Sequence, residues 1–131
     1  MGNNFVAQAL LDQGQDVRRW TDLDAEGWSD VKWIHAVGPN GWISLTRDDN
    51  IRRRVVEITA VRDARAMLFF IQGNKTGKDQ AAIVVAQLAR IIRIADAYAP
   101  PFIARITSAT VEVVPHGLLP EPCRRGAVKR D

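Results

Sequence analysis

The residues of this sequence that could carry chemistry gather just after a short apolar run at residues 42–46. That run is followed by two adjacent carboxylates and then by three consecutive arginines: Asp48, Asp49, Arg52, Arg53 and Arg54. Carboxylate oxygens are hard ligands that suit Mg²⁺, and guanidinium groups bind phosphate through paired hydrogen bonds. A metal-dependent enzyme that cuts phosphodiester bonds requires both. A polar loop that leads into a helix is the structural alternative, because short motifs also arise by chance.

The apolar run at residues 42–46 is rich in strand-forming residues and follows a turn-favouring Pro-Asn-Gly sequence. It therefore predicts a buried strand. In an open α/β sheet, ligands bind beyond the carboxyl ends of the strands. Asp48 and Asp49 are thus predicted to lie at the edge where such sheets carry their active sites.

Another carboxylate, Asp30, stands at the start of a helical apolar pattern in residues 31–37. Ser29 is a good N-cap, and the helix dipole favours a carboxylate in the first turn, so Asp30 also has a purely structural interpretation. His35 has no second His or Cys at metal-ligand spacing. We expect it on a polar face, or as a hydrogen-bonded histidine, rather than as a ligand.

Strand and helix patterns alternate along the chain, which predicts an α/β fold with a mainly parallel sheet and helices on both faces. Helices are predicted at residues 3–11, 31–37, 52–66 and 78–99, and strands at 16–20, 42–46, 67–71, 102–107 and 110–114. The last two strands are joined by a tight turn at Ser108 and Ala109, which predicts a C-terminal edge hairpin. The inward face of the helix at 52–66 is predicted to consist of Val55, Val56, Ile58 and Val61.

The longest predicted helix, residues 78–99, is apolar over most of its surface. Its polar positions form one narrow stripe, predicted as Gln80, Gln87, Arg90, Arg93 and Asp96. A helix with so wide an apolar surface is covered on more than one side. We expect one face to pack on the sheet and another to meet a helix or a second subunit, which would make the protein a homodimer.

The chain has 131 residues, which is the size of one domain, and 47% of them are hydrophobic. No apolar run reaches the roughly 18 residues of a membrane span, and the N-terminus lacks signal-peptide features, so we expect a cytoplasmic protein. The lone Cys123 is predicted to be a free surface thiol. The net charge of +3 comes entirely from residues 124–131. The rest of the chain is therefore neutral, and global charge does not indicate nucleic-acid binding.

Five segments occur in an order that resembles the PIN-like nucleases, in particular the VapC-type toxins. They are ALLDQGQDV, SDVKWI, GWISLTRDD followed by IRRR, FFIQGNKTG and PPFIARIT, within residues 3–114. The resemblance implies a three-layer α/β fold and a ribonuclease that depends on Mg²⁺ or Mn²⁺. It also implies an RNA substrate and a cognate antitoxin protein as partners. We expect the PIN-like domain at residues 1–116 and a flexible basic tail at 117–131.

The resemblance also implies roles for the residues singled out above. Asp30 and Asp48 match the family's acidic metal ligands, with Asp49 and Asn50 as neighbours that can ligate the ion or orient water. Arg52 and Arg53 match the basic residues that hold the phosphates of the substrate.

One departure concerns the family's first strand, which carries another catalytic aspartate and precedes the segment matched by residues 2–10. Either the true start codon lies upstream of Met1, or the protein is a shortened relative with an incomplete metal site. Three functions follow as hypotheses. The first is a metal-dependent endoribonuclease of a toxin–antitoxin system. The second is a catalytically silent PIN-like domain that binds proteins or dimerises, and the third is nucleic-acid binding without cleavage.

Overall fold

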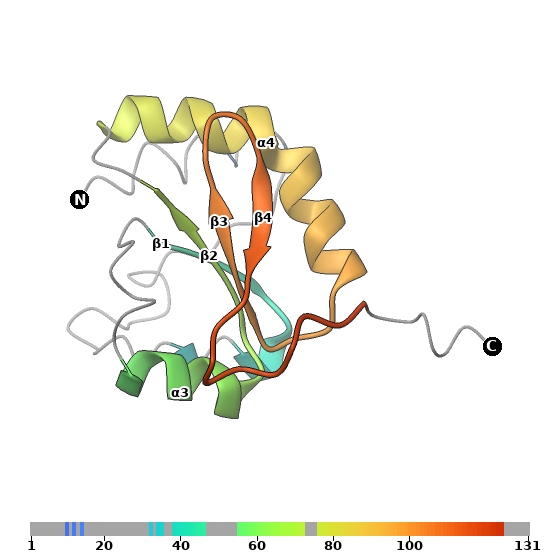
Figure 1. The fold of residues 1–131 in the computed structure, drawn as a ribbon. Coiled ribbons are helices and arrows are strands. Elements are labelled where there is room, and N and C mark those ends of the chain that lie inside the picture. The colour runs from blue at the N-terminus through green and yellow to red at the C-terminus, as the bar shows by residue number, and fades with distance from the viewer. Residues whose placement is uncertain are drawn as a thin grey trace.

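A computed structural model describes residues 10, 12, 14, 32, 34, 35, 38–46, 55–72 and 76–124. Within these residues the chain has an α/β fold, with one β-sheet and helices on both of its faces, as predicted (Figure 1). The predicted strand at residues 16–20 lies outside the described residues.

The sheet has four strands in the described part of the chain, in the order β1-β2-β3-β4. The strands are β1 (Ile43–Thr46), β2 (Met67–Ile71), β3 (Phe102–Ile106) and β4 (Val111–Val114). The pairs β1–β2 and β2–β3 are parallel, and β4 is antiparallel to β3. All five residues of β2 are buried, as expected of a central strand that is covered on both faces. The mainly parallel sheet and the C-terminal hairpin are therefore confirmed.

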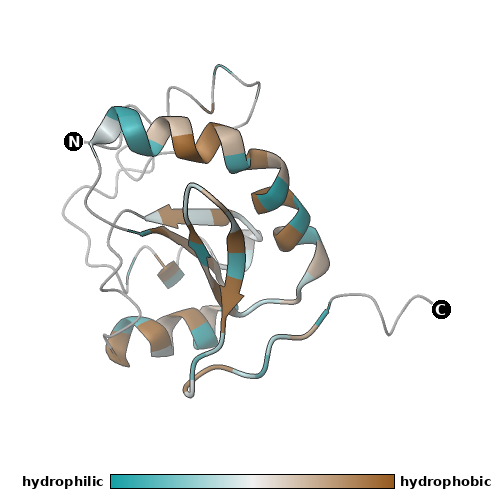
Figure 2. Ribbon diagram, turned by 45° about the horizontal axis from the view of Figure 1, so that its top comes forward, coloured by the Kyte–Doolittle hydropathy of each residue, from teal (hydrophilic) through white to brown (hydrophobic). Residues whose placement is uncertain are grey.

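Two helices cover opposite faces of this sheet, which gives three layers (Figure 1). Helix α4 (Gly77–Ala97) packs Val84, Ile91 and Ala95 against Phe69 and the other side chains on one face. Helix α3 (Val55–Ala64) covers the other face. Its buried side chains, Ile58, Ala60, Val61 and Ala64, pack against Leu68, Phe70 and Ile103. Figure 2 shows mostly apolar strands between the two helices.

Helix α3 ends at Ala64, two residues before the predicted end. The N–H of Arg65 donates to the carbonyl of Arg62, and the N–H of Ala66 donates to the carbonyl of Val61. These two bonds form a Schellman motif, with Arg65 in the left-handed conformation at φ 54°. Because that position usually holds glycine, an arginine there gives no stop signal in the sequence.

The predicted inward face of α3 is partly wrong. Ile58 and Val61 are fully buried, but Val55 and Val56 are each 64% exposed. Both valines lie in the first turn of the described helix. Apolar periodicity identifies a face but not where the surface that covers this face ends, and it therefore wrongly predicts burial of the first turn.

The predicted polar stripe of α4 is also partly wrong. Gln80 and Gln87 are 2% and 4% exposed, whereas Arg90, Arg93 and Asp96 are exposed as predicted. The Gln87 side chain donates through Nε2 to the carbonyl of Thr107, at 2.9 Å. Gln87 can belong to the buried face because the turn after β3 supplies an acceptor, which periodicity within the helix does not reveal.

Residues 117–124, the described part of the predicted tail, contact the folded domain. The carbonyl of Cys123 accepts a hydrogen bond from the N–H of Ala99, and the Arg124 guanidinium lies 5.2 Å from the centre of the Tyr98 ring. Cys123 is exposed and free, as predicted. The flexibility of the whole segment 117–131 stays a prediction. No helix among the described residues is both long and apolar enough to cross a membrane.

Candidate active site at the carboxyl edge of the sheet

The parallel strands β1, β2 and β3 end at the same edge of the sheet, which we call the carboxyl edge. The register aligns one residue from each strand in a row near this edge. Thr46 is paired with Phe70, Phe70 with Arg105, and Arg105 with Glu112. Paired residues lie on the same face of a sheet, and Phe70 belongs to the α3 side. The whole row therefore lies on the face that α3 covers.

The predicted site residues lie outside the described residues. They are Asp30, Asp48, Asp49, Arg52 and Arg53. The structure describes their neighbours in sequence: Thr46 ends β1 two residues before Asp48, and Val55 begins α3 two residues after Arg53. The segment with Asp48 and the arginines therefore connects the carboxyl end of β1 to α3.

The chain next to Asp30 is attached to the same side of the sheet. Lys32, Ile34 and His35 are helical, which agrees with the predicted helix at residues 31–37. Ile34 is fully buried in the cluster that contains Ile58 and Phe70. His35 is exposed, as expected for a residue on a polar face. The helical segment after Asp30 and the helix after Asp48, which is α3, thus both contribute side chains to the cluster between the sheet and α3.

The short 3-10 helix η1 (Gly38–Asn40) fixes the approach to β1. Gly38 packs against the last residue of α3, where an added Cβ would lie 2.8 Å from the Cβ of Ala64. The N–H of Gly41 donates to the carbonyl of Gly38 at 3.0 Å, which closes the turn into the strand. Gly41 has φ +68°, a conformation that suits glycine. This turn holds in place the strand that leads to Asp48.

The first turn of α4 follows β2 at the carboxyl edge. The Thr76 hydroxyl caps the helix by accepting a hydrogen bond from the N–H of Asp79, at 3.2 Å. Gln80, one residue further, is buried, and its Oε1 has no hydrogen-bond partner in the described part of the chain. Farther along α4, Gln87 bonds the carbonyl of Thr107, and Arg90 bonds both Gln87 and the carbonyl of Ala109. The middle of α4 therefore secures the turn between β3 and β4.

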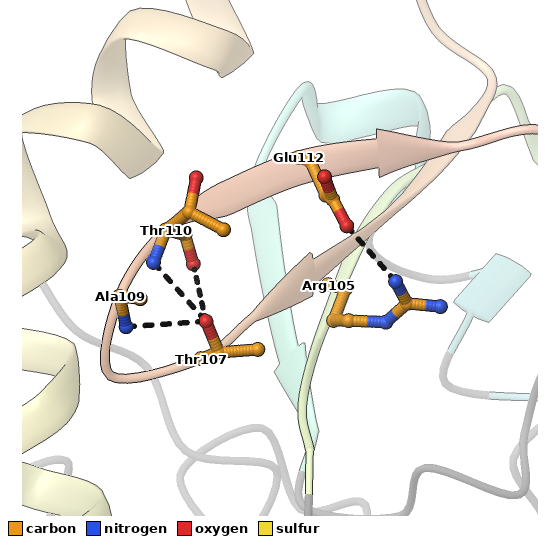
Figure 3. Close-up of polar contacts among 5 residues, drawn as sticks. All are labelled: Arg105, Thr107, Ala109, Thr110 and Glu112. Atoms are coloured by element: carbon orange, nitrogen blue, oxygen red, sulfur yellow. Dashed lines mark hydrogen bonds and ion pairs between the residues drawn. The ribbon is translucent and has the colours of Figure 1, made fainter.

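Arg105 and Glu112 form an ion pair that the sequence analysis missed (Figure 3). The guanidinium Nη1 donates to Oε2 of Glu112 at 2.9 Å, and the guanidinium carbon lies 5.9 Å from the centre of the Phe70 ring. The sequence does contain a signal for this ion pair. The predicted tight turn at residues 108 and 109 places Arg105 opposite Glu112 on the paired strands. Figure 3 also shows the hydroxyl of Thr107, which accepts hydrogen bonds from the N–H groups of Ala109 and Thr110.

The described residues contain no group of three or more His, Cys, Asp or Glu side chains placed to hold a metal ion. The carboxylates predicted as ligands belong to the segments outside the description. What the structure contributes is the framework: a parallel edge, a turn that positions β1, and a buried helical anchor near Asp30.

Comparisons with known proteins agree with this framework. A family model described as a PIN-like domain matches residues 1–73, which is more than half of the chain. The protein named "Putative ribonuclease VapC45" from Mycobacterium tuberculosis is 36% identical over 108 residues, which cover 79% of this chain and 78% of that protein. No solved structure matches the chain. The chain belongs to the PIN-like domain family and is related to its VapC-type members, as the five segments of the sequence predicted.

Proposed function

We propose that this protein is a VapC-type endoribonuclease, the toxin component of a toxin–antitoxin pair, with its active site at the carboxyl edge of the sheet. The observation that supports this most directly is the parallel register of β1, β2 and β3. It puts the end of β1, two residues before Asp48, at the edge where open α/β sheets bind ligands. Family membership and the relationship to VapC45 point to the same activity.

The proposed metal ligands are Asp30, Asp48 and Asp49. Their carboxylates form a hard oxygen donor set, which suits Mg²⁺ or Mn²⁺ and not the softer metals that prefer Cys or His. A bound divalent ion supplies an activated water and offsets charge on the scissile phosphate. Asp30 is followed by Ile34, and Asp48 is followed by α3, and both contribute side chains to the cluster between the sheet and α3. This shared anchoring supports the proposal that both acids serve one site.

Arg52 and Arg53 are the proposed phosphate-binding residues. A guanidinium presents several N–H donors in a fixed plane and pairs well with phosphate oxygens. Such contacts position a nucleic-acid backbone without reading its sequence. RNA is the proposed substrate because the relative VapC45 is named a ribonuclease, and action on cellular RNA beside an antitoxin would place the protein in the cytoplasm.

We also propose that residues 1–116 form the catalytic domain and residues 117–131 a basic tail. A homodimer is proposed through the outer surface of α4, where Val85 and Ile92 are only partly buried and lie outside the core clusters of the described residues.

Cleavage of single-stranded RNA in Mg²⁺ or Mn²⁺ tests the proposed activity. Asp48→Asn should lower the rate at least about a hundredfold, because even partners one step removed from a metal ligand typically contribute roughly 10–100-fold. Asp96→Asn is the matched control, since Asp96 is exposed on α4, away from the carboxyl edge. Its rate should equal that of the wild type.

Equal rates for Asp48→Asn and the wild type would remove Asp48 from the mechanism. A folded wild type that cleaves no RNA with either ion would contradict the nuclease assignment and favour a silent PIN-like domain.

A further inference from the structure

We propose that Arg105 forms an additional phosphate-binding subsite for the RNA backbone, beside the acids that follow β1. This inference rests on the proposed function. It adds a residue from the third strand of the sheet to a site otherwise made of segments that precede α3.

The strand register places Arg105 at the correct edge and on the correct face. Arg105 is one residue before the end of β3, and it is two strands away from Thr46 in the same row. Strands in a sheet lie about 4.8 Å apart, so the Cα atoms of Thr46 and Arg105 are about 10 Å apart. An extended arginine side chain spans much of that distance. Its guanidinium lies 5.9 Å from the ring centre of Phe70, which stands between Thr46 and Arg105 in the row, so it can contact substrate that extends from the segment after Thr46 across β2.

The guanidinium of Arg105 has donors left for a phosphate. Glu112 accepts one hydrogen bond from Nη1 through a single oxygen, although a carboxylate can accept two from the same arginine. The Nε of Arg105 has no partner among the described residues, but it is buried, so a phosphate would be bound by the Nη atoms. The side chain is 24% exposed, so the group remains open to solvent on one side. A partly shielded cation with unused donors is suited to an anionic oxygen.

A purely structural ion pair is a weaker explanation for these residues. The Glu112 side chain is 53% exposed, and pairs of that kind stabilise proteins little. The neighbours of Arg105 on this face, Leu68, Phe70 and Ile103, are apolar and fully buried. A valine or leucine at position 105 would fill the same place without a shielded N–H that lacks a partner. Glu112 instead orients the arginine while leaving one side of it free.

Binding of a labelled oligouridylate tests the subsite, with EDTA present so that no metal-dependent cleavage occurs. Arg105→Gln should weaken binding several-fold and reduce the dependence of log affinity on log salt concentration by roughly 0.7, the value for one phosphate contact on a single strand. Arg93→Gln is the control, because Arg93 is exposed on the opposite layer and loses the same charge. Thermal melts of each variant report on folding.

Glu112→Gln gives a second measurement that does not remove the arginine. The amide oxygen still accepts from Nη1, but the competing negative charge is gone, so RNA affinity should rise by about twofold or more. A purely structural pair would instead make both variants less stable and leave the salt dependence unchanged.

Affinity and salt dependence unchanged in Arg105→Gln, or an affinity that does not rise in Glu112→Gln, would overturn the subsite. A wild type that binds RNA through Arg105 but never cleaves it would refute the nuclease and support the subsite. A wild type that binds no RNA would refute both.

Discussion

Gln80 and Gln87 are the same residue type on the same helix, and both are almost fully buried, yet their amides have opposite surroundings. Oε1 of Gln80 has no hydrogen-bond partner among the residues that the structure describes. Gln87 donates to the carbonyl of Thr107, and its Oε1 accepts from Arg90 at 3.1 Å. A buried polar atom without a partner lowers stability, whereas one with partners leaves other groups unpaired when it is removed.

The same substitution should therefore have opposite effects at the two positions. Gln80→Leu should leave the free energy of unfolding unchanged or raise it by about 1 kcal/mol, because no hydrogen bond to Oε1 is lost. Gln87→Leu should lower it by about 1–3 kcal/mol, since the carbonyl of Thr107 loses its partner. Urea denaturation followed by circular dichroism measures both. Equal destabilisation by the two variants would show that Gln80 Oε1 has a partner in solution.

At the scale of elements, the contact between η1 and α3 decides where β1 lies. Gly38 leaves no room for a side chain beside Ala64, so the two elements approach at backbone distance. The strand that leads to Asp48 starts directly after this contact. The position of the candidate site therefore depends on a glycine outside it.

Gly38→Ala tests this close packing. The new Cβ would lie 2.8 Å from the Cβ of Ala64 and 2.9 Å from its carbonyl carbon, so the elements must separate. Overpacking of this kind typically costs about 1–3 kcal/mol of unfolding free energy. The measurement is thermal or urea denaturation, with Gly117→Ala as the control because no atom lies within 4 Å of a Cβ there. A Gly38→Ala protein as stable as the control would contradict the arrangement.

At the scale of the whole molecule, the three layers bring distant parts of the chain to one side of the sheet. Ile34, Ile58 and Ile103 share one cluster although they come from a helix near Asp30, from α3 and from β3. The proposal that Asp30 and Asp48 hold one ion follows from this shared anchoring. It predicts that the two acids are energetically coupled through the metal.

A double-mutant cycle on Mn²⁺ binding measures that coupling. Asp30→Asn and Asp48→Asn should each weaken binding, and the double variant should lose clearly less than the two losses combined, because the effects of ligands of one ion are not additive. Calorimetric titration gives the affinities, and Asp96→Asn controls for the loss of one negative charge. Losses that add within about 0.5 kcal/mol would place the two acids at independent sites.

Much of the architecture was predictable because its signals are local. The apolar run of β2 and the tight turn between β3 and β4 identified a central strand and a hairpin, and the α/β alternation predicted the parallel sheet. The motifs around Asp30 and Asp48 identified the family, since residue order survives in sequence comparison.

Other features were decided only when the chain packed. Three such features are the stop of α3 before Arg65, the exposure of Val55 and the burial of Gln87. Apolar periodicity within one segment does not report them, because they depend on how the segments pack. The tight turn already aligned Arg105 with Glu112, but the alignment of both with Thr46 required the register of the parallel strands. Register is a relation between distant segments, and for that reason only the tertiary structure brought Arg105 to the edge where the candidate site lies.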